Sequence, residues 1–398
     1  ADRSVQELPL NGRNVLNLVA LVPGVVPQGG SEGSLTGKNI FAAGKYQIGG
    51  GTANQSATLY DGVPVNIAYS NATILVPSQD AVSEFRVQTN NLSAEYGRYT
   101  GGVINVASKG GTNEFHGSAY EFLRNKALNA NTFFGNADGL EKPAFNQNQF
   151  GVTVGGPIRK DKTFFFAGYE GYRQRQAVQF RYTVPTADRL MGDFSNFRNA
   201  SGSLIPIYDP ATQCGAHDNA PCGEGGQQRQ PFPDNVIPPN RINPVAKNYI
   251  AFPYWGKPNT DGLEFTHQYN YSKNVSTGGN NDQLNFRVDQ NVSEKQHLLA
   301  RYTRWKSANK EVDIYGNGLY TGDPYSPERF VTTQVVVADT YSFSPTTIFD
   351  IRLGFTRWEY DRTPGTTGIN IPEATGLPSY YNQLDALRGL TGSTTIPT

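Results

Sequence analysis

The chain has 398 residues, and its 34 basic and 34 acidic side chains cancel to a formal charge of zero. Glycine (43), proline (25), tyrosine (22) and phenylalanine (22) are abundant, a composition that favours an all-β class. The balanced charge gives no argument for nucleic-acid binding, and the longest apolar stretch is broken by Asn17 and Pro23, so no transmembrane helix is expected.

The first 110 residues predict a small mixed α+β unit. Apolar residues between Val15 and Val22 recur at i, i+3, i+4 and i+7, which indicates a short amphipathic helix that ends at Pro23. Asp61-Gly62 is typical of a tight hairpin turn. Strands are expected at 84–89, after a helical start at Ser78, and at 103–108.

The remaining sequence contains seven strand candidates, several with strict alternation. In the fourth, apolar residues at 284, 286 and 288 alternate with Asn285, Arg287 and Asp289, and the fifth places Arg301 on its polar face. A lipid-facing barrel strand has this pattern, and so does a soluble sheet with one wet face. The candidates are approximately 115–124, 147–156, 163–178, 282–292, 296–306, 332–343 and 347–360.

The connections between these strands alternate between short and long, which is the pattern of an outer-membrane barrel with long extracellular loops. In that arrangement Trp305 and Trp358 stand at one level, either as part of an interfacial aromatic girdle or as ordinary edge aromatics. Seven strands cannot close such a barrel, and open edges are not viable in lipid. The sequence therefore predicts a fragment, unless a strand has been miscounted.

Several segments carry a family resemblance, among them "EFHGSAYEFLRN" (114–125) and, in the long loop, "VPTADRLMGDFS" and "PDNVIPPNRINPVAKNYIAFPYW", together with four longer or earlier stretches. The four stretches are "VQELPLNGRNVLNLVALVPGV" (5–25), "LYDGVPVN" (59–66), "VSEFRVQTNNLSAEYGRYTGGVINVASKGGTN" (82–113) and "NQFGVTVGGPIRKDKTFFFAGYEGYR" (148–173). Together they resemble the TonB-dependent outer-membrane receptors, in particular the Oar-like branch.

The resemblance implies a mainly β fold: an N-terminally truncated α+β plug domain at 1–112, then the first seven or so strands of an incomplete antiparallel transmembrane barrel at 113–398. A long loop is expected at 179–281. The implied location is the outer membrane of a Gram-negative cell, with the plug facing the periplasm and the long loops extracellular. Implied partners are outer-membrane lipid, an unidentified transported ligand and a TonB-type inner-membrane energiser that pulls on a segment absent from this sequence.

Charged side chains are the first site candidates. We expect Arg86 or Arg98 in the plug to pair with Glu121 or Glu170 in early barrel strands and lock the plug, although either arginine could simply be solvated. Plug glycines are expected to permit tight turns and close backbone approach. These are Gly62, Gly97, Gly101 and Gly102.

The long loop supplies the remaining candidates. Cys214 and Cys222 form either a disulfide or two free thiols. The aromatic residues Phe252, Tyr254 and Trp255 either contact a ligand or pack the loop.

The sequence does not indicate an enzyme, a metal or a cofactor, because the four histidines are scattered and no Cys/His cluster has metal-ligand spacing. The expected function is energised uptake of a siderophore, oligosaccharide or peptide. A secreted or surface all-β binding or adhesion protein is the alternative, and a glycan-active enzyme is a third. Adhesins are often built from repeats, and this sequence has no visible internal repeat.

Overall fold

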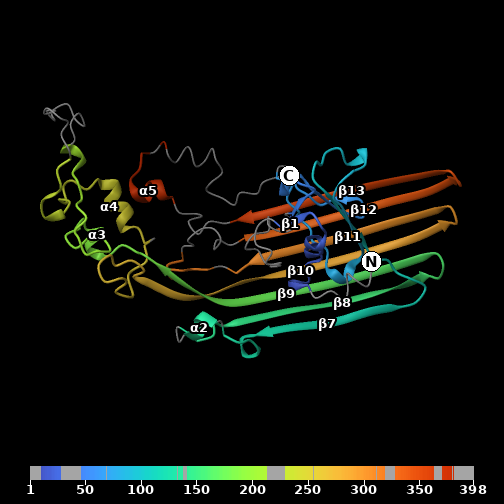
Figure 1. Ribbon diagram of the computed structural model, residues 1–398, viewed down its shortest axis with the longest axis horizontal. Helices are drawn as coiled ribbons and strands as arrows, with labels where there is room; N and C mark the ends of the chain where they lie inside the picture. The colour runs from blue at the N-terminus through green and yellow to red at the C-terminus, as the bar shows by residue number, and fades with distance from the viewer. Residues whose placement is uncertain are drawn as a thin grey trace.

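Seven long antiparallel strands form one sheet in which neighbours along the chain are also neighbours in space (Figure 1). The computed structural model describes residues 10–27, 46–68, 70–131, 133–137, 141–212, 229–253, 255–310, 312–318, 328–362, 370–378 and 380. All seven predicted strands are confirmed, most of them longer than expected. They are β7 His116–Asn125, β8 Phe145–Arg159, β9 Thr163–Tyr182, β10 Tyr271–Ser293, β11 Gln296–Asn309, β12 Glu328–Ser344 and β13 Thr347–Arg362.

This sheet, the strand wall, has short turns at one end and long connections at the other. Residues 160–162, 294–295 and 345–346 make the short turns. Figure 1 shows the helices of the long connections gathered at the opposite end. In the described residues β7 and β13 are the two edges, so the barrel is not closed. The helical segments here are η7 Lys126–Leu128, α2 Phe133–Ala137, α3 Ala187–Leu190, η8 Pro210–Thr212, η9 Pro233–Asn235, α4 Pro244–Ala251 and α5 Ile371–Thr375.

Residues 10–109 form a smaller body, the N-terminal unit, which lies across the wall (Figure 1). Its main sheet has the order β4-β3-β6-β5, with β3 and β6 parallel, and β1 pairs with β2. The predicted amphipathic helix is a 3-10 helix, η2. The elements are η1 Asn11–Arg13, η2 Val15–Leu21, β1 Val25–Pro27, β2 Tyr46–Ile48, η4 Ala53–Gln55, β3 Ala57–Tyr60, β4 Val63–Pro64, η5 Gln79–Ala81, β5 Val82–Gln88, η6 Ala94–Tyr96 and β6 Val103–Ser108. None of the described helices is long and apolar enough to cross a membrane.

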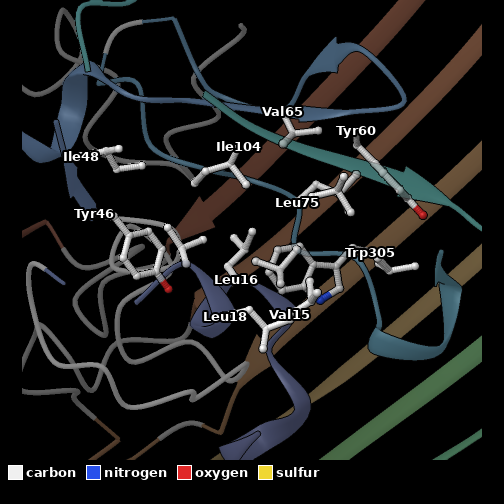
Figure 2. Close-up of a cluster of buried hydrophobic side chains, with 14 of the residues drawn as sticks. Val15, Leu16, Leu18, Tyr46, Ile48, Tyr60, Val65, Leu75, Ile104 and Trp305 are labelled. Atoms are coloured by element: carbon white, nitrogen blue, oxygen red, sulfur yellow. The ribbon is translucent and has the colours of Figure 1, made fainter. Parts of the chain in front are cut away.

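The hydrophobic core of the N-terminal unit is completed by the wall (Figure 2). Trp305 of β11 packs edge-to-face on Phe330 of β12 with ring centroids 4.8 Å apart, and both join the cluster formed by η2, β3 and β6. Trp358 joins Ile67 and Ile74 in a second cluster. The girdle interpretation was wrong: both tryptophans are 4% exposed and face inward, because strand alternation places them on the same face as the other side chains that meet the N-terminal unit.

The two faces of the wall differ as the alternation predicted. On β10, Asn285 and Asp289 are buried against the N-terminal unit, whereas Leu284 and Phe286 point outward and are exposed. Where the N-terminal unit ends, Gly111 runs directly over the wall, since an added Cβ would lie 2.3 Å from the Phe165 carbonyl oxygen. Only glycine leaves room for that approach.

Candidate functional site at the interface between the N-terminal unit and the wall

Side chains of the wall hold the N-terminal unit largely through its backbone. Six wall side chains each donate a hydrogen bond to a backbone carbonyl oxygen of the unit. Buried carbonyl groups need hydrogen-bond donors. The wall side chains therefore supply donors to carbonyl groups of the unit that its own secondary structure leaves unpaired. The pairs are Gln149 to Gly12 (3.4 Å), Arg301 to Tyr60 (3.2 Å), Gln334 to Pro64 (3.4 Å), Thr332 to Ile74 (2.6 Å), Gln283 to Val76 (2.7 Å) and Arg287 to Ser108 (2.7 Å).

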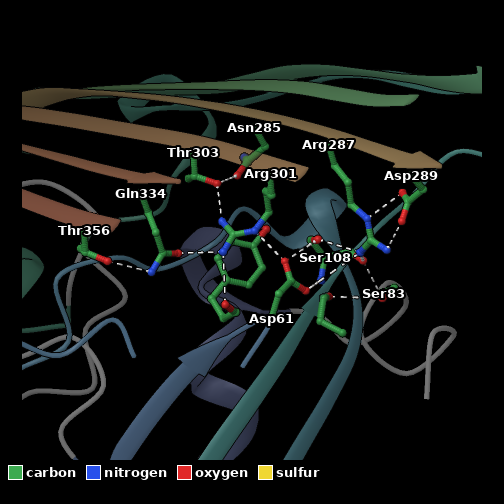
Figure 3. Close-up of polar contacts among 12 residues, drawn as sticks. Asp61, Ser83, Ser108, Asn285, Arg287, Asp289, Arg301, Thr303, Gln334 and Thr356 are labelled. Carbon is green, nitrogen blue, oxygen red and sulfur yellow. Dashed lines mark hydrogen bonds and ion pairs between the residues drawn. The ribbon is translucent and has the colours of Figure 1, made fainter. Parts of the chain in front are cut away.

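The most buried charges at this interface surround the turn between β3 and β4 (Figure 3). Asp61 and Gly62 both have positive φ, 50° and 79°, as a two-residue hairpin turn of this type requires. The Asp61 carboxylate accepts a 2.6 Å bond from Nε of Arg301 and bonds of 2.8 and 2.7 Å from the backbone N–H and hydroxyl of Ser108. The turn therefore inserts a carboxylate into the wall.

Every nitrogen of the Arg301 guanidinium has a partner. Besides Asp61 and the Tyr60 carbonyl, it donates to Thr303 Oγ1 at 2.6 Å and to Gln334 Oε1 at 2.7 Å. The guanidinium carbon lies 3.6 Å from the centre of the Tyr60 ring, a cation–π contact, and the Arg301 side chain is 1% exposed. Burial also raises the pKa of Tyr60, so its hydroxyl stays neutral beside this charge pair.

A second arginine balances the charge. Arg287 forms a two-pronged ion pair with Asp289, at 2.8 and 2.7 Å, and its Nη1 also reaches Ser108. This Nη1 lies 4.0 Å from Asp61. Two carboxylates thus face two guanidinium groups, which offsets part of the desolvation cost of burying them. We call Asp61, Arg287, Asp289 and Arg301 the Asp61 cluster.

A second set of charged side chains holds the start of the unit against β7 and β9. Arg13 pairs with Asp80 of the unit at 2.5 Å and lies 3.9 Å from Glu170 of the wall. Its guanidinium carbon lies 4.4 Å from the ring centre of Tyr120 and 5.1 Å from that of Phe122. The Tyr120 hydroxyl donates to Glu170 at 2.5 Å. Arg13 therefore provides a second charged link between the unit and the wall.

Replacing Arg13 by Met is expected to weaken docking of the unit by roughly 1–3 kcal/mol, because Asp80 and Glu170 would face each other without their shared cation. The measurement is the midpoint of thermal unfolding of the intact protein in detergent. Adding Glu170→Gln should restore part of the loss. Equal midpoints for the wild type and Arg13→Met would show that this group does not hold the unit.

Neither Arg86 nor Arg98 forms the predicted ion pair with Glu121 or Glu170 among the described residues. Glu170 is buried and faces the N-terminal unit, but through Arg13. Arg86 and Arg98 are exposed and form no ion pair with a wall carboxylate among the described residues. The prediction for Glu121 was wrong: it lies opposite Phe150 on the outward face, because Tyr120 takes the inward position on β7.

The four predicted glycines do not all have the same structural role. Gly62 has the positive φ of the β3–β4 turn. Gly102 allows close packing, since an added Cβ would lie 2.2 Å from Ile48 Cγ2. Gly101 lies against Ser56, whereas Gly97 follows η6 with ordinary backbone angles, and an added Cβ there would lie 3.3 Å from the Ala94 carbonyl oxygen.

The structure describes two of the five loop candidates, Phe252 and Trp255. Cys214, Cys222 and Tyr254 lie outside the described residues. Trp255 donates a 3.2 Å hydrogen bond to the Tyr249 carbonyl and packs edge-on against that ring, so it stabilises its own loop. A cavity of about 530 Å³ lies nearby between α4 and α5, but neither Phe252 nor Trp255 lines it. In the described part of the chain no group of three or more His, Cys, Asp or Glu residues could hold a metal ion.

The sequence reasoning did not single out Asp61, Arg13 or Arg301 as interface residues. A usable signal existed for two of them. Asp61 stands in a turn that was recognised, and Arg301 stands on the polar face of a strand whose other face is apolar. An inward-facing arginine requires an anion, and a turn aspartate is a suitable one.

Comparison with known proteins agrees with this architecture. The family model for the outer membrane beta barrel domain matches residues 107–397. The TonB-dependent transporter Oar of Myxococcus xanthus is 34% identical over 130 residues, which is 31% of this chain and 12% of that protein.

Among solved structures, the outer membrane transporter YddB from Escherichia coli is similar, with 11% sequence identity and a TM-score of 0.49. The match covers 91% of this chain and 38% of that one. A mutant ferric enterobactin receptor from Pseudomonas aeruginosa has 13% identity and a TM-score of 0.45, covering 88% and 39%. The chain thus spans only a minor part of each of these proteins. Because the barrel model matches well over half of the chain, the chain belongs to the outer membrane β-barrel domain family and is located in the outer membrane.

Proposed function

We propose that the chain is part of an active transporter of the outer membrane, in which residues 1–112 are the plug and residues 113–398 contribute about seven strands of the surrounding barrel. The observation that carries this proposal is the interface. The unit is seated on the inward face of the wall by hydrogen bonds and ion pairs as well as by apolar packing. Polar contacts of this kind can be exchanged for water, so the unit can be released and reseated.

The proposed energy source is a TonB-type inner-membrane partner that pulls on the plug from the periplasm. The 34% identity to a TonB-dependent transporter supports this assignment. In the proposed orientation the short turns face the periplasm and the long connections are extracellular. The transported ligand is a siderophore, an oligosaccharide or a peptide.

Energised release of the plug can be tested with a buried thiol. Thr332 is fully buried beneath the unit, where it bonds to Ile74. In cells that carry Thr332→Cys, with Cys214 and Cys222 and any other natural cysteine of the protein replaced by serine, we expect a membrane-impermeant maleimide to label the protein only when the inner membrane is energised. A protonophore should abolish labelling, while the exposed control Ser201→Cys should be labelled in both conditions. Labelling of Thr332→Cys that ignores the protonophore would contradict the proposal.

A further inference from the structure

Both ring nitrogens of His297 on β11 face oxygen atoms that accept hydrogen bonds. Nδ1 lies 2.8 Å from Oδ1 of Asn291, and Nε2 lies 3.3 Å from Oδ1 of Asp289. A neutral imidazole carries one N–H and donates to only one of these oxygens, whereas the imidazolium ion donates to both. The surroundings of His297 therefore fit its protonated form.

The Asn291 side chain is held in the orientation that presents its oxygen to the ring. Its Nδ2 donates to the Asp161 carbonyl oxygen at 3.3 Å, and its backbone N–H donates to the Lys162 carbonyl oxygen at 2.7 Å. Both carbonyl groups belong to the short turn between β8 and β9. A flipped amide would lose the bond to Asp161 and turn its own oxygen toward that carbonyl. Asn291 thus keeps Oδ1 directed at His297.

Asp289 connects His297 to the N-terminal unit. The buried carboxylate is shared between the ring and Arg287, which in turn donates to the carbonyl oxygen and hydroxyl of Ser108 (Figure 3). Asp289 also lies where the chain leaves the unit, since a Cβ added to Gly110 would be 2.8 Å from its Oδ2. A protonated His297 adds a second cation to this carboxylate and so fixes the position of Asp289 and Arg287 beneath the unit.

The other charged side chains around the ring are exposed or already paired in the part of the chain that the structure describes. Those in the two short turns are exposed, so water and salt screen them. Asp350, which bonds to Thr340 beside the ring, is paired with Arg352 at 3.0 Å. The charge of Arg287 opposes a second cation but is offset by Asp289 and Asp61. The turn residues are Asp161, Lys162, Glu294 and Lys295.

The ring of His297 exchanges protons with water. Its side chain is 45% exposed and borders a cavity of about 580 Å³ at the short-turn end of the wall, which Lys162 and Ser342 also line. Histidine is the side chain whose charge ordinarily changes between about pH 5 and pH 8. The medium at this end of the wall therefore sets the charge on His297.

We propose that docking of the N-terminal unit depends on pH through His297, whose protonation strengthens the contacts of Asp289 and Arg287 with the unit. Because docking favours the protonated ring, docking is strongest below the pH range in which histidine titrates and weakens as the pH rises through it. The meaning for transport rests on the proposed function: the unit is released more readily in a neutral or mildly alkaline medium than in an acidic one.

The test compares His297→Gln with the wild type by differential scanning calorimetry of the intact protein in detergent. At about pH 5.5 we expect the transition that includes the unit to lie about 2–4 °C lower in the variant, the effect of losing one partly exposed ion pair. At about pH 8 the two midpoints should coincide, because the wild-type ring is then neutral. His297→Arg, which is charged at both pH values, should differ from His297→Gln by the same amount at each.

Two further variants show whether the effect passes through Asp289. In an Asp289→Asn background, His297→Gln should no longer produce a pH-dependent difference, because the ring has lost its carboxylate partner. His267→Gln is the matched control. It removes another imidazole, which bonds to the Asp261 carbonyl in the connection between β9 and β10, and it should leave the midpoint unchanged at both pH values.

A difference between the wild type and His297→Gln that is the same at both pH values would overturn the inference, since the ring would then contribute only packing. Equal midpoints at both pH values, or a difference that grows as the pH rises, would overturn it as well. These midpoints require neither an energised membrane nor a transported ligand. Failure here therefore leaves the maleimide experiment unaffected, and the reverse also holds.

Discussion

Replacement of Asp61 by Asn is expected to destabilise docking of the N-terminal unit by about 3–5 kcal/mol, the usual cost of leaving a buried ion without its partner. The side chain would keep its size, but Arg301 would retain a full charge at 1% exposure with only neutral acceptors around it. Arg287, whose Nη1 lies 4.0 Å from Asp61, would also lose part of the negative charge that compensates its own. The measurement is the thermal unfolding midpoint of the intact protein.

A double-mutant cycle separates the ion pair from other effects of the substitution. Arg301→Met alone should also be costly, whereas Asp61→Asn/Arg301→Met should be far more stable than the sum of the two losses predicts, because no unpaired charge remains. Asp209→Asn is the matched control, since it removes the partner of Arg241 in an exposed loop and should leave the midpoint unchanged. Additive losses would show that Asp61 and Arg301 do not act as a pair.

The second large effect is expected for Trp305→Ala, at roughly 3–5 kcal/mol, because a cavity would open in the core shared by the unit and the wall. The substitution also leaves the Asn281 side chain, now 2.6 Å from the indole Nε1, without that donor. Differential scanning calorimetry should show a lower transition for the unit, with less change in the transition of the barrel.

Trp255→Ala provides the comparison, because this tryptophan packs within its own loop and contributes nothing to the shared core. If the two variants melted at the same temperature, the shared core would not depend on Trp305. A side chain in an outer aromatic girdle would instead affect how the protein sits in lipid and would not uncouple the unit from the wall.

Local patterns predicted much of this molecule. Period-two alternation in 282–292 identified both faces of β10, and Asp61-Gly62 identified the turn between β3 and β4. These features depend on backbone geometry that a few adjacent residues determine. Strand ends were less certain, and β10 begins eleven residues before the predicted start because Gly278 to Asn281 carry no hydrophobic signal.

The interface could not be predicted in the same way, because its partners are distant in sequence. Asp61 and Arg301 are separated by 240 positions, and no local pattern relates them. Glu121 shows a second difficulty. On β7 both faces carry aromatic or apolar residues, so the inward face is determined by contacts with distant residues: Arg13 packs on Tyr120 and Phe122, and Tyr120 bonds to Glu170. Trp305 was assigned to an outward-facing girdle for a related reason. Its flanking residues, Arg304 and Lys306, fit a tryptophan at the membrane interface as well as one in the core.

The backbone contacts across the interface have an evolutionary consequence. The wall recognises Gly12, Tyr60, Pro64, Ile74, Val76 and Ser108 through their carbonyl oxygens, which every amino acid possesses. These six contacts themselves do not depend on which side chain the unit carries at each point, whereas each donor on the wall is chemically constrained. Side-chain identity in the unit is constrained separately, as at Tyr60 by Arg301 and at Ser108 by Asp61. Relatives should therefore retain hydrogen-bond donors at these positions of the wall.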